Sequence, residues 1–398
     1  MDYISCNIGT ININTITNQT KRNALRTFIR TMKLDIIFLQ EVENENLSIP
    51  GYNVVSNVDH ARRGTAIALK ERIKFSHIEK SLDGRLVALR VNNTTLCNVY
   101  APSGTVFRAQ RERLFNSTIA YYLRHRTEHT ILGGDFNCVI RLCDSTGSNP
   151  SRALQATVQQ LRLHDVWQQL HPRQMEYTYI THNSSSRLDR LYVSEGLRDQ
   201  LRTTAAHVCC FTDHKAVTAR ICLPLPDTAP GRGFWCLKPH LLTAENIDEF
   251  QLRWQQWTRQ RCYYPTWMQW WLSYAKSKTQ SFFRWRSKIA YDGFYREQQR
   301  LFGLLRQAYD SYQNNRGMLT TINRLKAEML SHQRRFSEMF TRINETFVAG
   351  EPPSIYQLGE RTRRKTTIVE LQNERGEVIN DPAAVRNHMV QDFTDLYS

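Results

Sequence analysis

Short apolar runs alternate with stretches of helical spacing along the first 225 residues. The apolar runs predict strands over residues 3–8, 35–39, 64–69, 85–91, 95–100, 130–132, 188–193 and 216–221. Apolar residues spaced three and four apart predict helices over residues 23–32, 111–124 and 152–161. Many short strands with few intervening helices indicate a layered α/β domain with stacked sheets.

Residues 224–233 mark a change in composition. Three prolines and two glycines in ten residues cannot continue a helix or a central strand. Beyond them Gly and Pro are sparse over residues 269–347, and the apolar spacing predicts long amphipathic helices. We expect a strand, a turn and a helix within residues 366–398. The predicted organisation is a domain over 1–224, a linker over 225–239, a basic helical connector over 240–350 and a final segment over 351–398.

The charge balance points to a polyanionic partner. Lys and Arg number 53 against 37 Asp and Glu, and the net charge is +16. Such a surplus favours nucleic acid or an acidic membrane surface as the partner. No apolar run reaches the roughly 18 residues that span a bilayer, and no secretory signal is evident, so we expect no membrane partner. Nine cysteines without a C-x-x-C pair indicate a reducing compartment, cytosol or nucleus.

Polar clusters follow several predicted strands of the first domain, where a site can rest on rigid supports. Their residue types suit phosphodiester hydrolysis, which needs a hard divalent cation, an activated water and a cradle for the phosphate. Mg²⁺ prefers carboxylate and amide oxygens as ligands. Glu41 is therefore a candidate metal ligand, with Asn7 beside it.

The other clusters supply candidate catalytic groups. His214 can change charge near neutral pH, and Asp189 can orient it. Asp135 could position or deprotonate water, and Asn137 could hold the scissile phosphate. The hydroxyl of Tyr100 could stabilise developing negative charge.

Each candidate also has an ordinary structural explanation. Asn7 could be a turn residue, and Glu41 a solvated carboxylate. Asp189 lies between Arg187 and Arg190, where it could form a surface ion pair. The ordered combination is far more specific than any single residue.

That combination resembles the endonuclease/exonuclease/phosphatase family, which includes DNase I, abasic-site endonucleases and inositol polyphosphate 5-phosphatases. The resemblance covers residues 1–224 and implies a four-layered α/β sandwich and Mg²⁺-dependent hydrolysis, with Mn²⁺ as an alternative metal. It places Asn7 and Glu41 near the metal, with Asp213 as a second ligand or a hydrogen-bond partner. It places the remaining candidates at the attacking water and the phosphate: Tyr100, Asp135, Asn137, Asp189 and His214. Asp135 and His214 both remain open as the group that activates water.

Three segments, 63–69, 133–139 and 186–194, are similar to the endonuclease of LINE-type non-LTR retrotransposons. Residues 231–238 resemble the segment that follows this nuclease, and residues 366–398 resemble the lead-in to the reverse transcriptase. The resemblance implies nuclear action after passage through the cytoplasm, and a reverse transcriptase module as partner. No Tyr/Phe-x-Asp-Asp polymerase motif occurs, so we expect the chain to be the front of a longer protein.

The helical region combines cations with aromatic side chains. Residues 253–342 hold 17 Lys and Arg against 5 Asp and Glu, which favours contact with DNA or element RNA. Aromatic residues at helical spacing are more often bundle core than a stacking platform for bases. The candidate nucleic-acid-binding residues are Arg63, Arg190, Tyr192, Arg284, Arg286 and Lys288.

Together with the resemblance, these observations predict an Mg²⁺-dependent endonuclease that nicks double-stranded DNA. The resemblance implies that the nick leaves a 3′-hydroxyl to prime reverse transcription. Two alternatives stay open. One is a phosphatase of the same fold that acts on an inositol or lipid phosphate. The other is a non-enzymatic nucleic-acid-binding remnant of a retroelement.

Overall fold

The computed structural model describes residues 3–16, 18–59, 63–147, 149–181, 183–224, 237, 241–312, 316–348, 371–372 and 378–379. Residues 1–340 form one compact unit, and residues 341–398 form a second. The linker predicted over 225–239, apart from residue 237, and most of residues 351–398 lie outside the described residues.

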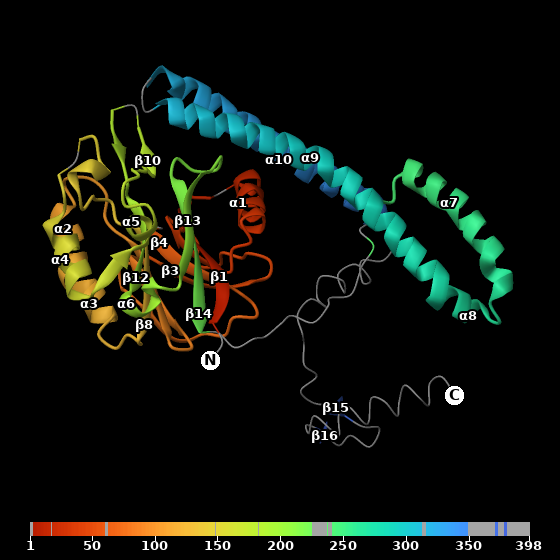
Figure 1. Ribbon diagram of the computed structural model, residues 1–398, viewed down its shortest axis with the longest axis horizontal. Helices are drawn as coiled ribbons and strands as arrows, with labels where there is room; N and C mark the ends of the chain where they lie inside the picture. Colours follow the sequence, from red (N-terminus) through yellow and green to blue (C-terminus); the bar gives the residue numbers. More distant parts are fainter. Residues whose placement is uncertain are drawn as a thin grey trace. The chain divides into compact units, whose positions relative to one another are not determined.

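Two six-stranded mixed sheets form the centre of the first unit (Figure 1). In spatial order, the first sheet contains β13 (Leu201–Val208), β14 (Lys215–Pro224), β1 (Tyr3–Asn12), β2 (Ile36–Gln40), β4 (Gly64–Lys70) and β3 (Tyr52–Val58). The second contains β5 (Ser76–Lys80), β6 (Leu86–Val91), β7 (Thr94–Tyr100), β8 (His129–Asp135), β12 (Asp189–Ser194) and β9 (Leu163–Asp165). The short strands β10 (Tyr179–Ile180) and β11 (Ser185–Ser186) form a separate hairpin.

Helices pack against the two sheets, on their outer faces and beside the core between them. Those of the first 224 residues are α1 (Gln19–Thr31), α2 (Arg108–Arg113), a π-helical turn (Leu114–Ile119), α3 (Ala120–Tyr122), α4 (Arg152–Gln160), α5 (Val166–Leu170) and α6 (Glu195–Arg198). α1 and α4 begin at side-chain caps, because Asn18 and Ser151 accept hydrogen bonds from backbone N–H groups in the first turn.

Three apolar layers hold the sheets and helices together. Side chains such as Ile8 and Phe38 from one sheet, and Ile131 from the other, fill the space between the sheets. Phe28 of α1 belongs to a cluster on the outer face of the first sheet. Phe115 of the π-helical turn belongs to a cluster on the outer face of the second. The order helix, sheet, sheet, helix confirms the predicted four-layered α/β sandwich.

The helical region contains α7 (Ala244–Thr258), α8 (Trp267–Trp270), α9 (Lys276–Tyr312) and α10 (Leu319–Val348). The long helices α9 and α10 lie side by side and antiparallel, as a helical hairpin (Figure 1). The rings of Phe294 and Phe336 stack across this hairpin with centroids 3.7 Å apart. The predicted long helices are therefore confirmed. Among the described residues, no helix is long and apolar enough to cross a membrane.

In the second unit, β15 (Leu371–Gln372) pairs with β16 (Val378–Ile379) in antiparallel register. The turn and the helix predicted within residues 366–398 lie outside the described residues.

Candidate active site

Strand register brings the ends of several strands to one edge of the sandwich. β1 and β2 run parallel and place Asn12 opposite Gln40, so that Glu41 follows at the same end. β7 and β8 are also parallel and place Tyr100 opposite Asp135. β12 is antiparallel to β8, so its first residue, Asp189, pairs with Asp135. Residues far apart in the chain thus share one location.

The Asn12 amide organises the two sheets at this edge. Its Nδ2 donates to Glu41 Oε1 at 3.0 Å and to Asp135 Oδ2 at 2.9 Å. Its Oδ1 accepts the backbone N–H of Asn14 at 3.0 Å, which fixes the orientation of the amide. Asn12 is fully buried, so these bonds are shielded from competing water.

The structure does not bring Asn7 together with Glu41, beside which it was predicted to lie near the metal. Its side chain donates to the carbonyl of Lys33 and accepts from Arg220 Nε, each at 3.2 Å. Asn7 precedes Asn12 by five strand residues, which at about 3.3 Å per residue separates them by roughly 16 Å. Sequence reasoning ended this strand at Ile8 and missed Asn12. Extending the strand until its end matched that of β2 would have found it.

Tyr100 and Glu41 form a second contact at the site. The Tyr100 hydroxyl donates to Glu41 Oε1 at 3.1 Å. Burial raises the pKa of Tyr100, and the carboxylates of Glu41 and Asp135 raise it further. The phenol therefore stays protonated and remains a hydrogen-bond donor at neutral pH. Glu41 has a left-handed backbone with φ 57°, a sparsely populated conformation for this residue type.

Two glycines allow β8 to carry Asp135 into the site. A Cβ on Gly134, which has φ 149°, would lie 1.9 Å from the carbonyl oxygen of Val99 on β7. A Cβ on Gly133 would lie 2.5 Å from the ring of Phe38 in the facing sheet. Backbone and facing sheet approach too closely here for any side chain, which explains the Gly-Gly-Asp order in the sequence.

Asp135 is buried and held by several donors. Besides Asn12, it accepts the backbone N–H of Asn137 at 2.9 Å and Asn137 Nδ2 at 3.2 Å. Asn137 Nδ2 also donates to the carbonyl of Ala101 at 2.8 Å, so both amide hydrogens are engaged within the protein. Burial raises the pKa of Asp135, and the neighbouring Asp189 carboxylate raises it further against the opposing effect of His214.

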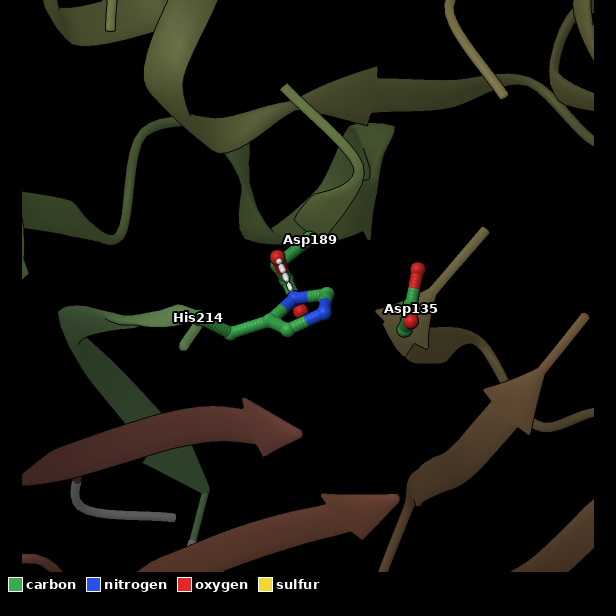
Figure 2. A group of neighbouring side chains, drawn as sticks. All are labelled: Asp135, Asp189 and His214. Atoms are coloured by element: carbon green, nitrogen blue, oxygen red, sulfur yellow. Dashed lines mark hydrogen bonds and ion pairs between the residues drawn. The ribbon is translucent and has the colours of Figure 1, made fainter. Parts of the chain in front are cut away.

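His214 faces Asp135 and is paired with Asp189 (Figure 2). His214 Nδ1 lies 2.9 Å from Asp189 Oδ2, and both side chains are buried. Burial by itself would lower the pKa of His214, but the Asp189 charge and hydrogen bond raise it above its ordinary value. With Nδ1 bound, Nε2 points towards Asp135 (Figure 2). The ring of Tyr179 covers the imidazole at 4.6 Å between centroids.

The loop that carries His214 is tied to the end of β1. The Thr212 hydroxyl donates to the carbonyl of Asn12 at 2.8 Å and accepts the backbone N–H of His214 at 3.2 Å. Asp213 Oδ1 accepts from Asn14 Nδ2 at 2.9 Å. Asp213 is therefore a hydrogen-bond partner of Asn14, which in turn contacts Asn12.

Acidic and imidazole groups gather closely enough to hold a cation. One ligand atom each from Asp135, Asp189 and His214 lies within 4.8 Å of the others, and Glu41 lies across Asn12 from Asp135. Carboxylate oxygens are hard ligands that suit a divalent cation such as Mg²⁺. An imidazolium at His214 repels a cation, so the Glu41 side of Asn12 fits a metal better than the histidine side.

Two of the predicted nucleic-acid-binding residues are misplaced. Arg190 and Tyr192 point from β12 into the layer beneath the outer helices and are buried. Arg190 donates to the carbonyl of Cys138 at 2.9 Å and pairs with Asp144 at 3.6 Å. Tyr192 packs edge-on against Phe136. Both faces of β12 are covered in the sandwich, so the structure does not present either side chain to DNA.

The other four predicted nucleic-acid-binding residues differ in their exposure to solvent. Arg63, Arg284 and Lys288 are exposed. The Arg286 side chain is only 12% exposed and pairs with Glu245 at 3.0 Å and Glu249 at 2.8 Å. Arg286 therefore links α9 to α7, and its charge is already neutralised within the protein. Several aromatic residues of this region are buried as core, as expected, and Trp270 is fully so, although Trp267 and Trp285 remain exposed.

Comparison with known proteins agrees with this architecture. Residues 5–214 match the model of the endonuclease/exonuclease/phosphatase family. The chain is 25% identical over 291 residues to the transposon TX1 uncharacterized 149 kDa protein of Xenopus laevis, covering 67% of this chain. It spans 22% of the length of that relative.

Solved structures are also similar to part of the chain. An AP endonuclease from Archaeoglobus fulgidus is 20% identical with a TM-score of 0.48, and a 3′–5′ exonuclease from Neisseria meningitidis is 19% identical with a TM-score of 0.47. Each match covers 54% of this chain and 99% of the other. Since the family model matches more than half of the chain, the resemblance seen in the sequence is confirmed, and the chain belongs to the endonuclease/exonuclease/phosphatase family.

Proposed function

We propose that the chain is a metal-dependent endonuclease that nicks double-stranded DNA by hydrolysing a phosphodiester bond. The observation that carries this proposal is that Asp135 faces the His214–Asp189 pair, while Asn12 joins Asp135 to Glu41. A buried carboxylate facing a cationic imidazole offers a proton acceptor and a phosphate-binding charge on opposite sides of one space.

Each residue then has a defined task. Asp135, whose pKa is raised, orients the attacking water and accepts its proton. His214 is kept protonated by Asp189, and its Nε2–H donates to a non-bridging oxygen of the phosphate. Tyr100, as a protonated phenol, donates where negative charge develops. Asn137 positions Asp135, because its amide hydrogens are used inside the protein and are not free to hold the phosphate.

A divalent cation, Mg²⁺ or Mn²⁺, fits the oxygen ligands on the Glu41 side of the site. Glu41 would hold it, with Asp213 as a candidate second ligand from the neighbouring loop. When bound, the cation supplies Lewis-acid stabilisation of the charge on the phosphate and leaving oxygen. Asn12 keeps Glu41 oriented for this task through its amide hydrogen bond.

The similarity to a transposon protein supports a role in retroelement mobility. A nick that leaves a 3′-hydroxyl on target DNA in the nucleus would prime reverse transcription of the element RNA by a reverse transcriptase module. The exposed cations of α9, among them Arg284 and Lys288, would contact the DNA or RNA backbone.

A plasmid assay tests the proposal. Purified chain is incubated with supercoiled plasmid and Mg²⁺ or Mn²⁺, and with EDTA as control. We expect conversion to open circle that stops with EDTA, and nicks that a DNA polymerase can extend directly. Glu41→Ala and His214→Ala should abolish nicking while salt-sensitive DNA binding persists, whereas Asn7→Ala should nick normally.

Either of two results would contradict the proposal and favour one of the alternative functions. Hydrolysis of an inositol phosphate without any plasmid nicking would identify a phosphatase of the same fold. DNA binding without hydrolysis of either substrate, under all metal conditions, would identify a non-enzymatic binding protein.

A further inference from the structure

The helical hairpin of α9 and α10 shares an apolar core with the sandwich. Ile180 of β10 and Val208 of β13 are buried in one cluster with side chains of both helices. The helical members of this cluster are Leu301, Leu305, Ala308, Tyr309, Tyr312, Ile322, Leu325 and Met329. Burial of this many large apolar side chains is typical of a domain interior rather than of a loosely attached connector.

One lysine of the hairpin reaches the loop that carries His214. Lys326 Nζ on α10 donates to the carbonyl of Thr212 at 2.8 Å. The ammonium lies 5.5 Å from the ring centroid of Tyr309 on α9, as does that of Lys215 on β14. Burial lowers the pKa of Lys326, and the Asp213 carboxylate opposes this effect. A partly buried cation therefore contacts the active-site loop.

Thr212 connects Lys326 to the catalytic groups. Its carbonyl accepts from Lys326, while its hydroxyl donates to the carbonyl of Asn12 and accepts the N–H of His214. Thr212 thus links the helical hairpin to both the histidine and the asparagine that organise the site. A shift of this one residue would move His214 relative to Asp135.

A second contact supports the same histidine from the other side. The Tyr312 hydroxyl at the end of α9 donates to the carbonyl of Thr181, directly after β10. The ring of Tyr179 on β10 lies tilted against the His214 ring, and the backbones of the two residues form a β-bridge. The hairpin therefore braces the neighbours of His214 at two points.

We infer that the α9–α10 hairpin completes the nuclease site and that Lys326 is a positioning residue, which holds Thr212 so that His214 faces Asp135. The predicted effect of Lys326 on kcat rests on the proposed nuclease function. The predicted ordering of the loop by Lys326 can be measured without any activity.

The experiment uses the full chain with Lys326→Met, which keeps the apolar stem and volume but removes the charge and the donor. Lys326→Arg keeps a cationic donor at the same position. Arg324→Met is the matched control, since it removes a cation from an exposed position on the same helix. Lys326→Gln serves as a second, milder variant that retains an N–H donor without the charge.

Hydrogen–deuterium exchange followed by mass spectrometry reports on the loop. We expect peptides that cover residues 209–216 to exchange about tenfold faster in Lys326→Met than in the wild type, with little change in Lys326→Arg or Arg324→Met. Exchange in peptides from β7 and β8 should be unchanged in every variant. Unchanged protection of residues 209–216 in both the Met and Gln variants would overturn the inference, whether or not the chain cuts DNA.

Plasmid nicking separates positioning from general stability. We expect Lys326→Met to lower kcat about tenfold or more with KM for DNA nearly unchanged, and Lys326→Arg to recover most of kcat. A lysine that only stabilised the fold would lower the melting temperature and leave kcat of the folded fraction intact, which would contradict positioning. A wild-type chain that fails to nick DNA would refute the proposed function while the exchange result still stands.

Discussion

Asn12 joins Glu41 and Asp135 through one amide nitrogen, at 3.0 Å and 2.9 Å, although the two carboxylates belong to different sheets. The amide thus sets the distance between the group that would hold a metal and the group that would activate water. Two carboxylates on one donor also repel each other, so the arrangement depends on the intact amide.

Asn12→Ala should lower nicking by about 10²-fold, because it frees both carboxylates and leaves Asp135 without one of its donors. Asn7→Ala is the matched control on the same strand and should retain nearly wild-type kcat. Steady-state nicking at saturating Mg²⁺ measures both. Equal losses in the two variants would show that the strand, rather than the site, is being perturbed.

Asp189→Asn should lower the pKa of His214. In the wild type the Asp189 charge outweighs burial and keeps the imidazole protonated well above its ordinary range. Without that charge, burial is opposed only by the charges of Asp135 and Asp213, so the pKa of His214 should fall. A ¹⁵N NMR titration of the metal-free protein would follow the ring directly. A titration midpoint that does not move would contradict the assigned ion pair.

The same pair links stability to pH. A folded-state pKa above the unfolded value means that the His214–Asp189 pair stabilises the protein below the ordinary histidine pKa, and that this contribution is lost as pH rises. Asp189→Asn should therefore lower the free energy of unfolding more at pH 6 than at pH 9. Urea unfolding at the two pH values provides the measurement.

The lowered pKa of His207 predicts that the folded protein loses stability in acid. Burial lowers its pKa from 6.5 to about 4, with Arg306 adding to the effect. Between these values the unfolded chain takes up a proton that the folded chain does not, so stability falls as pH drops, by up to about 3 kcal/mol. His207→Gln should reduce this acid sensitivity, and the exposed control His77→Gln should not. Urea unfolding between pH 7 and pH 4 would show whether the two variants differ.

Arg284→Ala and Lys288→Ala should each weaken DNA binding and reduce the slope of log K against log salt by about 0.9, if each contacts one phosphate. Their melting temperatures should stay unchanged because both side chains are exposed. Arg286→Ala should instead lower the melting temperature, since it breaks the link from α9 to Glu249 on α7. Fluorescence anisotropy over a salt series, beside thermal melts, distinguishes these effects.

Much of the fold could be predicted because buried strands and capped helices leave strong patterns. The strands that include Phe38, Ile67 and Ile131 are continuous apolar runs with both faces covered. β3 and β13 were missed, since they lie at the edges of the first sheet and bury only part of their side chains. Edge strands carry weak alternation that resembles loop sequence.

Residue type and strand end coincide at Glu41, Asp135 and His214, and the structure brings these three residues to one edge of the sandwich. The sequence was a weaker guide where one strand face had to be chosen. Arg190 follows Asp189 directly, yet alternation along the strand turns its side chain into the opposite, buried layer. The contact of Lys326 with Thr212 joins residues 114 positions apart, and no local sequence pattern predicts such a contact.

The place of β14 in the first sheet has a consequence for synthesis on the ribosome. β14 lies between β13 and β1, so the first strand of the chain gains its antiparallel neighbour only after residue 224 has emerged. His214 directly precedes this strand, and its loop contacts α10 farther along still. A nascent chain that already carries Asn12, Glu41 and Asp135 therefore lacks a completed site. The full set of site residues is therefore present only once His214 and the strand that follows it have been synthesised.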